Sequence, residues 1–390
     1  MDNALLDIQQ RPARQQPSWE DQAAVRRVRE KLAANPALVA ADDVHTLRAL
    51  LARVAAGEAN VVQAGDCAED PAECTPSYVA RKAGLVDMLA GALTMVTHRP
   101  VVRVGRLAGQ FGKPRSKPTE RVGGVELPVY RGHMVNSPEP DPELRRPDPE
   151  RMLMGYEASR DVLDHLGWRS GATRSGLVTP VWTSHEALLL DYEIPMVRRD
   201  GQGRLLLTST HWPWIGDRTR QVDGAHVALL AAVANPVACK VGPSTGRDEL
   251  LALCEKLDPE RDPGRLTLIA RMGAERVADL LPPLVAAVRA AGHPVVWLSD
   301  PMHGNTVTTT EGLKTRCLHT ISSEVRQFQH AVRSAGAVAG GLHLETTPDD
   351  VTECVRNAAH LDHAGDKYTS LCDPRLNPHQ ALTVVSAWLG

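Results

Sequence analysis

The chain has 390 residues, enough for one large domain or two ordinary ones. Its net charge of −3, from 44 basic and 47 acidic side chains, argues against a surface that attracts nucleic acid or membrane, and an aromatic content of 4% leaves little on which single-stranded bases could stack. Seven scattered cysteines without a CxxC pair, no apolar leader at the N-terminus and no apolar run of membrane-spanning length indicate a soluble protein of the reducing cytoplasm.

The chain begins with an extension and continues as an alternation of strands and helices. Residues 1–58 contain two helical patterns and predict an N-terminal extension packed on a large domain at 59–390. Within that domain, short apolar runs rich in β-branched residues alternate with longer stretches of helical period. The expected strands are 60–65, 101–106, 176–182, 204–209, 236–242, 265–271, 294–300 and 340–345. A helix is expected between the third and fourth strands, at 183–193.

Eight strands separated mostly by helices predict an α/β fold, namely a (β/α)8 TIM barrel with an N-terminal helical extension. The strands read as continuous apolar runs, as a parallel sheet that is buried on both faces requires. A doubly wound open sheet is the alternative fold, but no GxGxxG fingerprint follows any of these strands.

Polar side chains collect where the predicted strands end, which is the edge where a barrel of this class holds its active site. Six of them are cations: Arg106, Lys113, Arg115, Arg218, Lys240 and Arg271. Any one of them alone reads as a solvated or paired charge, but six at one mouth require anions that neutralise them. Arg suits bidentate contacts to phosphate or carboxylate, and Lys acts as a point charge. The set indicates at least two anionic groups, as two phosphorylated substrates would provide.

A second group of strand-end residues offers one thiol, one imidazole and two carboxylates. Its members are Cys67, His303, Glu345 and Asp373. Taken singly, a buried Cys is usually a small hydrophobe, and no local spacing such as HExxH marks a metal site. Together the four form a mixed sulfur, nitrogen and oxygen set that suits Mn, Fe, Co or Zn. Asp300 is expected to be a hydrogen-bond partner of this set and not a ligand.

A metal beside phosphate-binding cations favours Lewis-acid activation of a carbonyl on a phosphorylated substrate. The chain has no GxxxxGK[ST] loop and no GxSxG nucleophile elbow. Nucleotide hydrolysis and catalysis by a serine nucleophile are therefore disfavoured.

The motifs at these positions resemble those of the class II 3-deoxy-D-arabino-heptulosonate 7-phosphate (DAHP) synthases. From about Gln15 to the C-terminus they include GDCAED, RLAGQFGKPRS, YRGHMVNS, TSHEALLLDYE, WIGDRTRQVDGAH, ANPVACKVGPS, LIARMG, DPMHGNT, KTR, GGLHLE and CDPRLNP. The resemblance implies a (β/α)8 barrel with an N-terminal extension. It also implies an enzyme of the shikimate pathway that condenses phosphoenolpyruvate with erythrose 4-phosphate and water, giving DAHP and phosphate.

The resemblance further implies a role for each strand-end residue. The ligands of a divalent metal, expected to be Mn²⁺ with Co, Fe or Zn as alternatives, would be Cys67, His303, Glu345 and Asp373. Phosphoenolpyruvate would be held by Arg106, Arg218, Lys240 and Arg271. Erythrose 4-phosphate would meet Lys113, Pro114, Arg115 and Ser116. The expected catalytic residues are Lys240, Asp217 and Glu186, with Asp217 and Lys240 orienting the attacking water.

Two features depart from the family's pattern. Asp217 stands where members commonly carry Glu. Little chain lies between the helix that ends near Trp168 and the TSHE motif at 183–186, where longer members insert a helical hairpin that takes part in feedback inhibition by aromatic amino acids. This second departure predicts weak or absent inhibition by Phe, Tyr or Trp, as in short members that serve secondary metabolism such as phenazine pathways.

Two other functions remain open. An amino-DAHP synthase of an aminoshikimate pathway would have the same phosphoenolpyruvate site. A non-catalytic regulatory partner of chorismate mutase is the other alternative, but such a protein would not need both the metal set and the cations. We expect a cytoplasmic homo-oligomer, a dimer or a tetramer, with two small-molecule substrates and with chorismate mutase as the one candidate protein partner.

Overall fold

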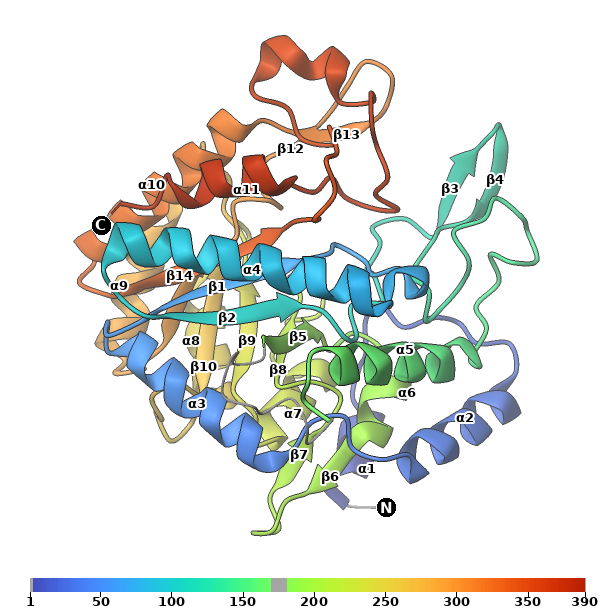
Figure 1. Ribbon diagram of the computed structural model, residues 1–390. Coiled ribbons are helices and arrows are strands. Elements are labelled where there is room, and N and C mark those ends of the chain that lie inside the picture. The colour runs from blue at the N-terminus through green and yellow to red at the C-terminus, as the bar shows by residue number, and fades with distance from the viewer. Residues whose placement is uncertain (1–2, 170–180, 390) are drawn as a thin grey trace. The chain divides into compact units, whose positions relative to one another are not determined.

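The computed structural model describes residues 3–169 and 181–389, and it confirms the barrel (Figure 1). Eight strands close in the order β1, β14, β11, β10, β9, β8, β5, β2. In chain order they are β1 (Asn60–Gly65), β2 (Val101–Arg106), β5 (Trp182–Glu186), β8 (Trp212–Ile215), β9 (Val237–Val241), β10 (Leu266–Ala270), β11 (Val296–Ser299) and β14 (Ala339–Glu345). Pairs such as β1 with β14 and β10 with β11 are parallel, as the barrel prediction requires.

Helices and short antiparallel ribbons complete the fold. The α-helices are α1 (Asn3–Gln10), α2 (Gln22–Ala34), α3 (Ala41–Ala55), α4 (Pro76–Thr97), α5 (Arg151–His165), α6 (Leu190–Glu193), α7 (Ala225–Ala232), α8 (Arg247–Leu257), α9 (Val277–Ala290), α10 (Leu318–Ser334) and α11 (Pro378–Val385). The 3-10 turns are η1 (Pro71–Glu73), η2 (Ile194–Met196) and η3 (Ala358–His363). The ribbons pair β3 (Thr119–Val122) with β4 (Val125–Pro128), β6 (Val197–Arg199) with β7 (Leu205–Leu207), and β12 (Thr306–Thr308) with β13 (Lys314–Arg316).

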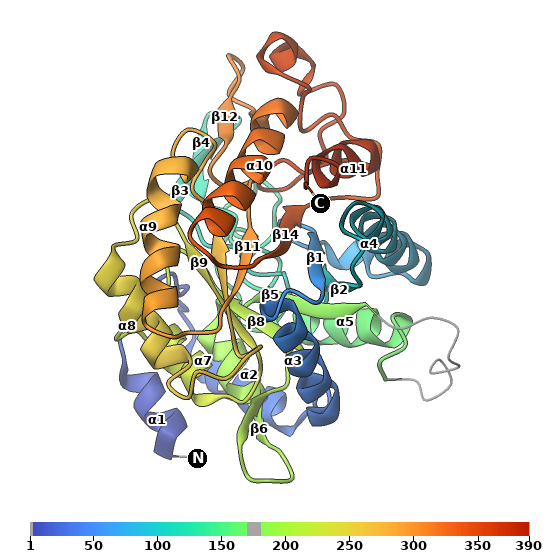
Figure 2. The same ribbon diagram turned by 90° about the vertical axis from the view of Figure 1, so that its left-hand side faces the viewer.

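The chain divides into two compact units. The first unit comprises Met1–Val44, Ala68–Ala80 and Leu107–Asn235, and the second comprises His45–Cys67, Arg81–Arg106 and Pro236–Gly390. In the second unit, strands β2, β1, β14, β11, β10 and β9 follow one another in the sheet, and helices α8, α9 and α10 pack in succession (Figure 2). In the first unit, β5 pairs with β8.

The strands of the second unit are buried because their apolar runs face packing on both sides. Strands β9, β10 and β14 are buried at every position. Close pairing of β14 with β1 depends on Gly341, whose φ of 150° is rare for other residues and whose Cβ would lie 1.9 Å from the Val61 carbonyl oxygen. Polar side chains at the ends of such strands are therefore held by a rigid, fully packed sheet.

Two of the predictions around the third and fourth strands are wrong. The helix expected at 183–193 is instead strand β5 at Trp182–Glu186, and only Leu190–Glu193 is helical. The strand expected at 204–209 corresponds to β7, which pairs with β6 outside the barrel, and the barrel strand is β8 at Trp212–Ile215. Of the third strand, expected at 176–182, residues 176–180 lie outside the described part of the chain.

Local chemistry explains both errors. Pro213 lies in the middle of β8, and a proline argues against a central strand because it has no N–H to donate. The first four residues of β5 are all buried and lead directly into a buried leucine run, so the alternation that marks a half-exposed strand is absent. In the ranges 3–169 and 181–389, no helix combines the length and apolar character that a membrane crossing requires.

Candidate active site

Three of the four predicted metal ligands lie together at the ends of strands β1 and β14. The register pairs Gly65 of β1 with Glu345, the last residue of β14, and Cys67 follows β1 by two residues. Asp373 comes from the segment before α11, and its Oδ2 lies 3.5 Å from Cys67 Sγ. One ligand atom from each of Cys67, Glu345 and Asp373 lies within 4.8 Å of the others.

His303 joins this trio through Glu345. Its Nε2 lies 3.1 Å from Glu345 Oε1, and its Nδ1 lies 2.8 and 3.0 Å from the two oxygens of Asp300. A proton on Nδ1 that is donated to Asp300 leaves the lone pair on Nε2, which is the arrangement of metal-ligating histidines. Asp300 is therefore a hydrogen-bond partner of His303, as the sequence predicts.

The donor set fits a divalent transition metal. A thiol, an imidazole and two carboxylates are hard to keep together in a buried place unless cations compensate them. The protein supplies part of the compensation: Glu345 accepts hydrogen bonds from Arg106 Nη2 at 3.1 Å and from Arg316 Nη1 at 2.8 Å. Asp373 accepts one from Lys314 Nζ at 2.7 Å. Since a carboxylate has about four lone-pair positions, acceptor capacity remains for an ion.

Sequence reasoning missed Arg316 and Lys314. Both belong to the KTR motif at 314–316. A short basic tripeptide does not by its spacing indicate a functional site. Arg316 is fully buried, and its pKa is raised because Glu345 and Asp373 outweigh the effect of burial. It acts on the metal set through Glu345.

A buried arginine joins the two ends of the metal set. Arg375 Nη1 donates to Asp66 Oδ1 at 3.1 Å, and Asp66 immediately precedes Cys67. The same guanidinium donates through Nη2 and Nε to the two oxygens of Glu353, at 2.9 and 3.2 Å. Burial alone would lower the pKa of Arg375, but Glu353 and Asp66 outweigh it and raise the pKa.

Glu353 holds the segment that carries Asp373. This fully buried carboxylate accepts hydrogen bonds from the backbone N–H groups of Thr369, Ser370 and Arg375, at 3.0, 2.7 and 2.7 Å. These backbone groups lie on both sides of Asp373 in the chain. Sequence reasoning missed Glu353 and Arg375, because their pairing joins two loops and follows no local spacing.

Three of the predicted anion-binding cations crowd together in the second unit. The Nζ of Lys240 pairs with Asp300, and its side chain is almost fully buried. The pKa of Lys240 is lowered to about 8, chiefly by burial; Arg106 and Arg271 add to the lowering and Asp300 opposes it. Since each cation raises the free energy of the others, an anion bound among them would be strongly stabilised.

Arg106 is held rigidly by its neighbours. It donates to the Asp66 carbonyl at 3.1 Å and to His343 Nε2 at 2.7 Å. Because a guanidinium only donates, His343 accepts through Nε2 and donates through Nδ1 to Gln63 Oε1, at 2.6 Å. Burial, followed by the charges of Lys240 and Arg106, holds the pKa of His343 well below its ordinary value. His343 is therefore a neutral support for Arg106.

The remaining predicted residues lie in the first unit. The segment after β2 contains Lys113, Pro114, Arg115 and Ser116. Ser116 Oγ accepts a hydrogen bond from Arg218 Nη2 at 2.7 Å, so the residues after β8 reach this segment. The Arg115 guanidinium lies 3.0 Å from Glu120 Oε2. Arg218 thus contacts the segment that contains two other predicted cations, Lys113 and Arg115.

Glu186 is the last residue of β5, and Asp217 follows the neighbouring strand β8 by two residues. In the parallel register of β5 and β8, Glu186 lies opposite Trp214. A Cβ at Gly216 would lie 2.0 Å from Glu186 Oε1, so this carboxylate lies against the backbone that precedes Asp217. Asp217 Oδ1 accepts a hydrogen bond from Arg220 Nε at 3.0 Å. Gly216 is thus the residue whose missing side chain leaves room for the Glu186 carboxylate.

A buried carboxylate also holds the loop that leads from β2 to Lys113. Glu69 accepts hydrogen bonds from the backbone N–H groups of Ala108, Gly109 and Gln110, at 3.1, 2.9 and 2.7 Å. Ala108 and Gly109 have φ of 62° and 142°, and this turn directs three N–H groups to one acceptor. Sequence reasoning missed Glu69, although it belongs to the GDCAED motif.

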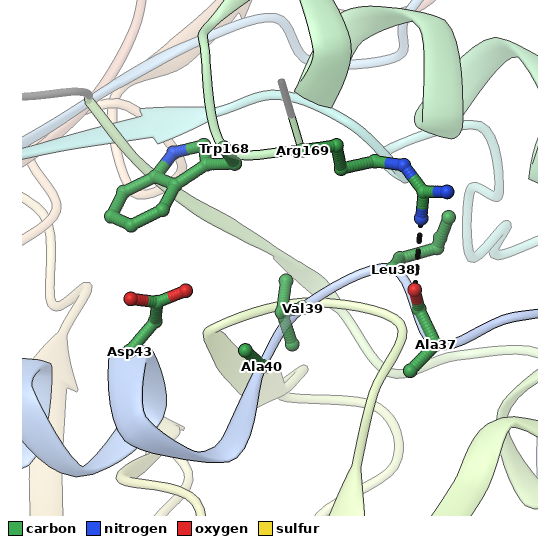
Figure 3. Close-up of a pocket in the computed structure, with 7 residues that line it drawn as sticks. All are labelled: Ala37, Leu38, Val39, Ala40, Asp43, Trp168 and Arg169. Carbon is green, nitrogen blue, oxygen red and sulfur yellow. Dashed lines mark hydrogen bonds between the residues drawn. The ribbon is translucent and has the colours of Figure 1, made fainter. Parts of the chain in front are cut away.

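A pocket of about 250 Å³ lies elsewhere in the first unit (Figure 3). Its lining consists of Ala37, Leu38, Val39, Ala40, Asp43, Trp168 and Arg169. Arg169 Nη1 donates to the Ala37 carbonyl at 2.9 Å, as the dashed line in Figure 3 marks. None of the predicted site residues lines this pocket, so it is not the place of the chemistry described above.

The chain is similar to one family along nearly its whole length. It matches the model of the Class-II DAHP synthetase family at residues 4–177 and 166–387. It is 59% identical over 389 residues to a probable phospho-2-dehydro-3-deoxyheptonate aldolase of Pseudomonas fluorescens, covering 100% of this chain and 97% of that protein. Phospho-2-dehydro-3-deoxyheptonate aldolases of Streptomyces coelicolor and Mycolicibacterium smegmatis are 40% and 38% identical over 419 and 436 residues, covering 95% and 98% of this chain and 93% and 92% of those proteins.

The Arg375 contacts predict a defect in metal binding. Replacing Arg375 by Lys keeps the charge but removes the contacts that reach Glu353 and Asp66 together. We expect the affinity for Mn²⁺ to fall by roughly 10- to 100-fold, as is typical when a group that supports a metal ligand is lost. Isothermal titration calorimetry measures the change. Arg356→Lys, an exposed change in the same part of the chain, is the matched control, and a folded Arg375→Lys protein with wild-type affinity would contradict the assignment.

Proposed function

Since the chain belongs to the Class-II DAHP synthetase family, we propose that it condenses phosphoenolpyruvate with erythrose 4-phosphate and water, giving DAHP and inorganic phosphate. The observation that carries the proposal is the Cys67–Glu345–Asp373 trio, in which Cys67 and Glu345 are buried and Asp373 is partly exposed. It supports a cation-binding centre directly beside arginine and lysine side chains that suit anions. A metal site next to anion sites is what a reaction between two phosphorylated substrates requires.

Cys67, His303, Glu345 and Asp373 would hold the divalent metal, with Mn²⁺ as the first choice and Co²⁺, Fe²⁺ or Zn²⁺ as alternatives. The chemistry that such an ion supplies is Lewis-acid polarisation of the aldehyde of erythrose 4-phosphate. The protein's own part is to present the ligands. Asp300 keeps a proton on Nδ1 of His303, and Arg375 keeps the two ends of the set together.

Phosphoenolpyruvate would be bound by the crowded cations. Arg106, Lys240 and Arg271 offer charge to its carboxylate and phosphate groups, and Arg218 is the fourth member of the set. The lowered pKa of Lys240 is consistent with this role: burial is its chief cause, and the neighbouring charges of Arg106 and Arg271 lower it further. A bound anion would offset those charges.

Erythrose 4-phosphate would be bound by the segment Lys113, Pro114, Arg115 and Ser116. Arg115 and the Ser116 hydroxyl suit its phosphate group, whose oxygens accept several hydrogen bonds. The Lys113 ammonium suits the polar end of the same substrate. The hydrogen bond from Arg218 to Ser116 supports a site in which the loops after β2 and β8 both contribute to anion binding.

The reaction follows from this placement. C3 of phosphoenolpyruvate forms a bond to the aldehyde carbon, and the aldehyde oxygen becomes a hydroxyl when it takes a proton. Water adds at C2, and the C2–O bond to phosphate breaks, so that phosphate leaves and the ketone forms. Asp217, Lys240 and Glu186 would orient the water and move its protons. Holding both substrates in place contributes up to roughly 7–11 kcal/mol to the lowering of the barrier.

The short connection near Trp168 supports an enzyme without feedback inhibition by aromatic amino acids, as in secondary metabolism. The family match is split into two pieces that overlap at 166–177. The alignments with the S. coelicolor and M. smegmatis proteins, at 419 and 436 residues, are longer than this 390-residue chain. Those relatives therefore contain residues with no counterpart here, which is consistent with a missing insertion.

We also propose a boundary between an extension at 1–58 and a barrel domain at 59–390, a homo-oligomer, a chorismate mutase partner and a cytoplasmic location. Size-exclusion chromatography with light scattering, with and without chorismate mutase, addresses the second and third.

Consumption of phosphoenolpyruvate tests the proposed function. We expect its absorbance to fall when erythrose 4-phosphate and Mn²⁺ are added, EDTA to abolish the loss, and excess Mn²⁺ to restore it. Cys67→Ser should raise the Mn²⁺ concentration needed for half-maximal activity by roughly tenfold or more, since a soft thiolate ligand is lost. Cys74→Ser, at a cysteine outside the trio, is the control. A metal-replete wild-type protein that consumes no phosphoenolpyruvate would refute the proposal.

Binding of phosphoenolpyruvate should weaken as the pH rises above about 8. In the free protein the pKa of Lys240 is lowered to about 8, so its charge is present at lower pH and is lost as the pH passes through this value. The phosphate group contributes no change, because its second pKa is about 6. Titration calorimetry from about pH 7 to 9 should show Kd rising by up to about tenfold per pH unit above the pKa. Lys240→Arg, which stays charged, should give a flatter profile; a flat wild-type profile would contradict the role of Lys240.

Aromatic amino acids should not inhibit the enzyme. We expect Phe, Tyr and Trp, alone or combined at millimolar concentration, to leave the rate within about 20% of its value without them, in contrast to the 5- to 150-fold effects of typical allosteric coupling. Titration calorimetry should detect no binding, with phosphoenolpyruvate as the positive control in the same preparation. Tight binding of Trp or Phe would overturn the prediction.

A further inference from the structure

The segment between α1 and α2 contains a residue in an uncommon backbone conformation. Gln15, in the sequence RPARQQP at 11–17, has φ of 64°. A residue other than glycine adopts this left-handed conformation rarely, and it persists only where surrounding contacts hold it. The contacts of Gln15 and its neighbour Gln16 show which segments this conformation connects.

Gln15 is bonded to the segment assigned to the phosphate of erythrose 4-phosphate. Its side-chain Oε1 accepts the backbone N–H of Arg115 at 2.9 Å, and its carbonyl accepts Arg131 Nη2 at 2.6 Å. The carbonyl of Arg131 in turn accepts the backbone N–H of Lys113 at 2.8 Å. Since Pro114 has no N–H, both backbone donors of the tripeptide Lys113–Arg115 are engaged by Gln15 or by its partner Arg131.

Gln16 is bonded to a different loop. Its Oε1 accepts the backbone N–H of Leu190 at 3.0 Å, and its Nε2 donates to the Leu188 carbonyl at 2.8 Å. These two residues follow strand β5, which ends at Glu186. The left-handed turn at Gln15 therefore lets two adjacent side chains reach the loops that follow two different barrel strands.

Charge around this segment also fits an anion. The Arg115 guanidinium is held by Glu120, which also accepts Arg145 Nη1 at 2.5 Å. The pKa of Arg131 is lowered, first by burial and second by the positive charge of Arg115. Arg115 and Arg145 thus share one carboxylate, and the charge of Arg115 also acts on Arg131. This excess of positive charge supports a doubly charged phosphate as the ligand.

We propose that the dipeptide Gln15–Gln16 is a positioning element of the acceptor-phosphate site, which fixes the backbone of Lys113–Arg115 and fastens it to the loop after β5. The inference rests on the proposed function, because it assigns the segment Lys113–Arg115 to erythrose 4-phosphate. It places part of the N-terminal segment in the substrate site. The two glutamines act through Lys113 and Arg115 and are not expected to touch the reacting atoms.

Gln15→Ala tests the proposal, with Gln10→Ala as the matched control at an exposed position of α1. We expect Gln15→Ala to raise KM for erythrose 4-phosphate by roughly 3- to 10-fold, as the loss of one hydrogen bond predicts, with kcat and KM for phosphoenolpyruvate near those of the wild type. Gln16→Ala should raise the same KM, because it removes the hydrogen bonds that join this segment to Leu188 and Leu190 after β5. Gln10→Ala should change neither constant.

Hydrogen–deuterium exchange gives a readout that does not depend on activity. The peptide containing Arg115 should exchange faster in Gln15→Ala than in the wild type and in Gln10→Ala. If the wild type is active but folded Gln15→Ala keeps its KM for erythrose 4-phosphate, the inference is wrong and the proposed function stands. If the wild type consumes no phosphoenolpyruvate, the proposed function fails. Faster exchange in Gln15→Ala would then show that Gln15 fixes this backbone, but the assignment of the segment to erythrose 4-phosphate would be overturned.

Discussion

The need to pair buried charge organises the second unit. Buried ion pairs of this unit include Lys82–Asp66, Arg375–Asp66, Arg375–Glu353, Arg106–Glu345, Arg316–Glu345 and Lys240–Asp300. Removing one member of such a pair leaves a charge without compensation in a medium that solvates it poorly, so each side chain is confined to one arrangement. Two groupings of like chemistry lie among these pairs: a thiol with two carboxylates, and the cations Arg106, Lys240 and Arg271. The first offers donors for a metal cation, and the second suits anionic substrates.

The first unit achieves the same rigidity mainly through hydrogen bonds to the backbone. Glu69 gathers three N–H groups of the loop after β2, and Gln15 takes the N–H of Arg115 further along the same loop. Each acceptor replaces water as the partner of backbone N–H groups and so stabilises one loop conformation. The proposed binding segment would thus be arranged before a substrate arrives, which would lower the entropy that binding must overcome.

Residue types at strand ends predicted much of the site but little of its support. Cys67, Glu345 and Asp373 were recognisable as a donor set, and the structure brings their ligand atoms together. Glu353 and Arg375 were not recognisable, since a buried acid and a buried base look like surface charges until their loops are placed. The sequence predicts the barrel class correctly but places two of its strands wrongly. Pro213 argues against the strand that β8 forms, and the buried residues at the start of β5 resemble a helix.

The sequence by itself determined the barrel class and the chemical types that lie at its rim. Apolar runs of strand length alternate with helical periods, and the polar residues that end those runs are set by the order of the chain. Only the tertiary structure decided which of these groups meet. Arg375 reaches Asp66 across 309 positions of sequence, and Gln15 reaches Arg115 across 100. Such contacts depend on loop conformations and on the burial of charge, which are properties of the packed molecule and leave no local period in the sequence.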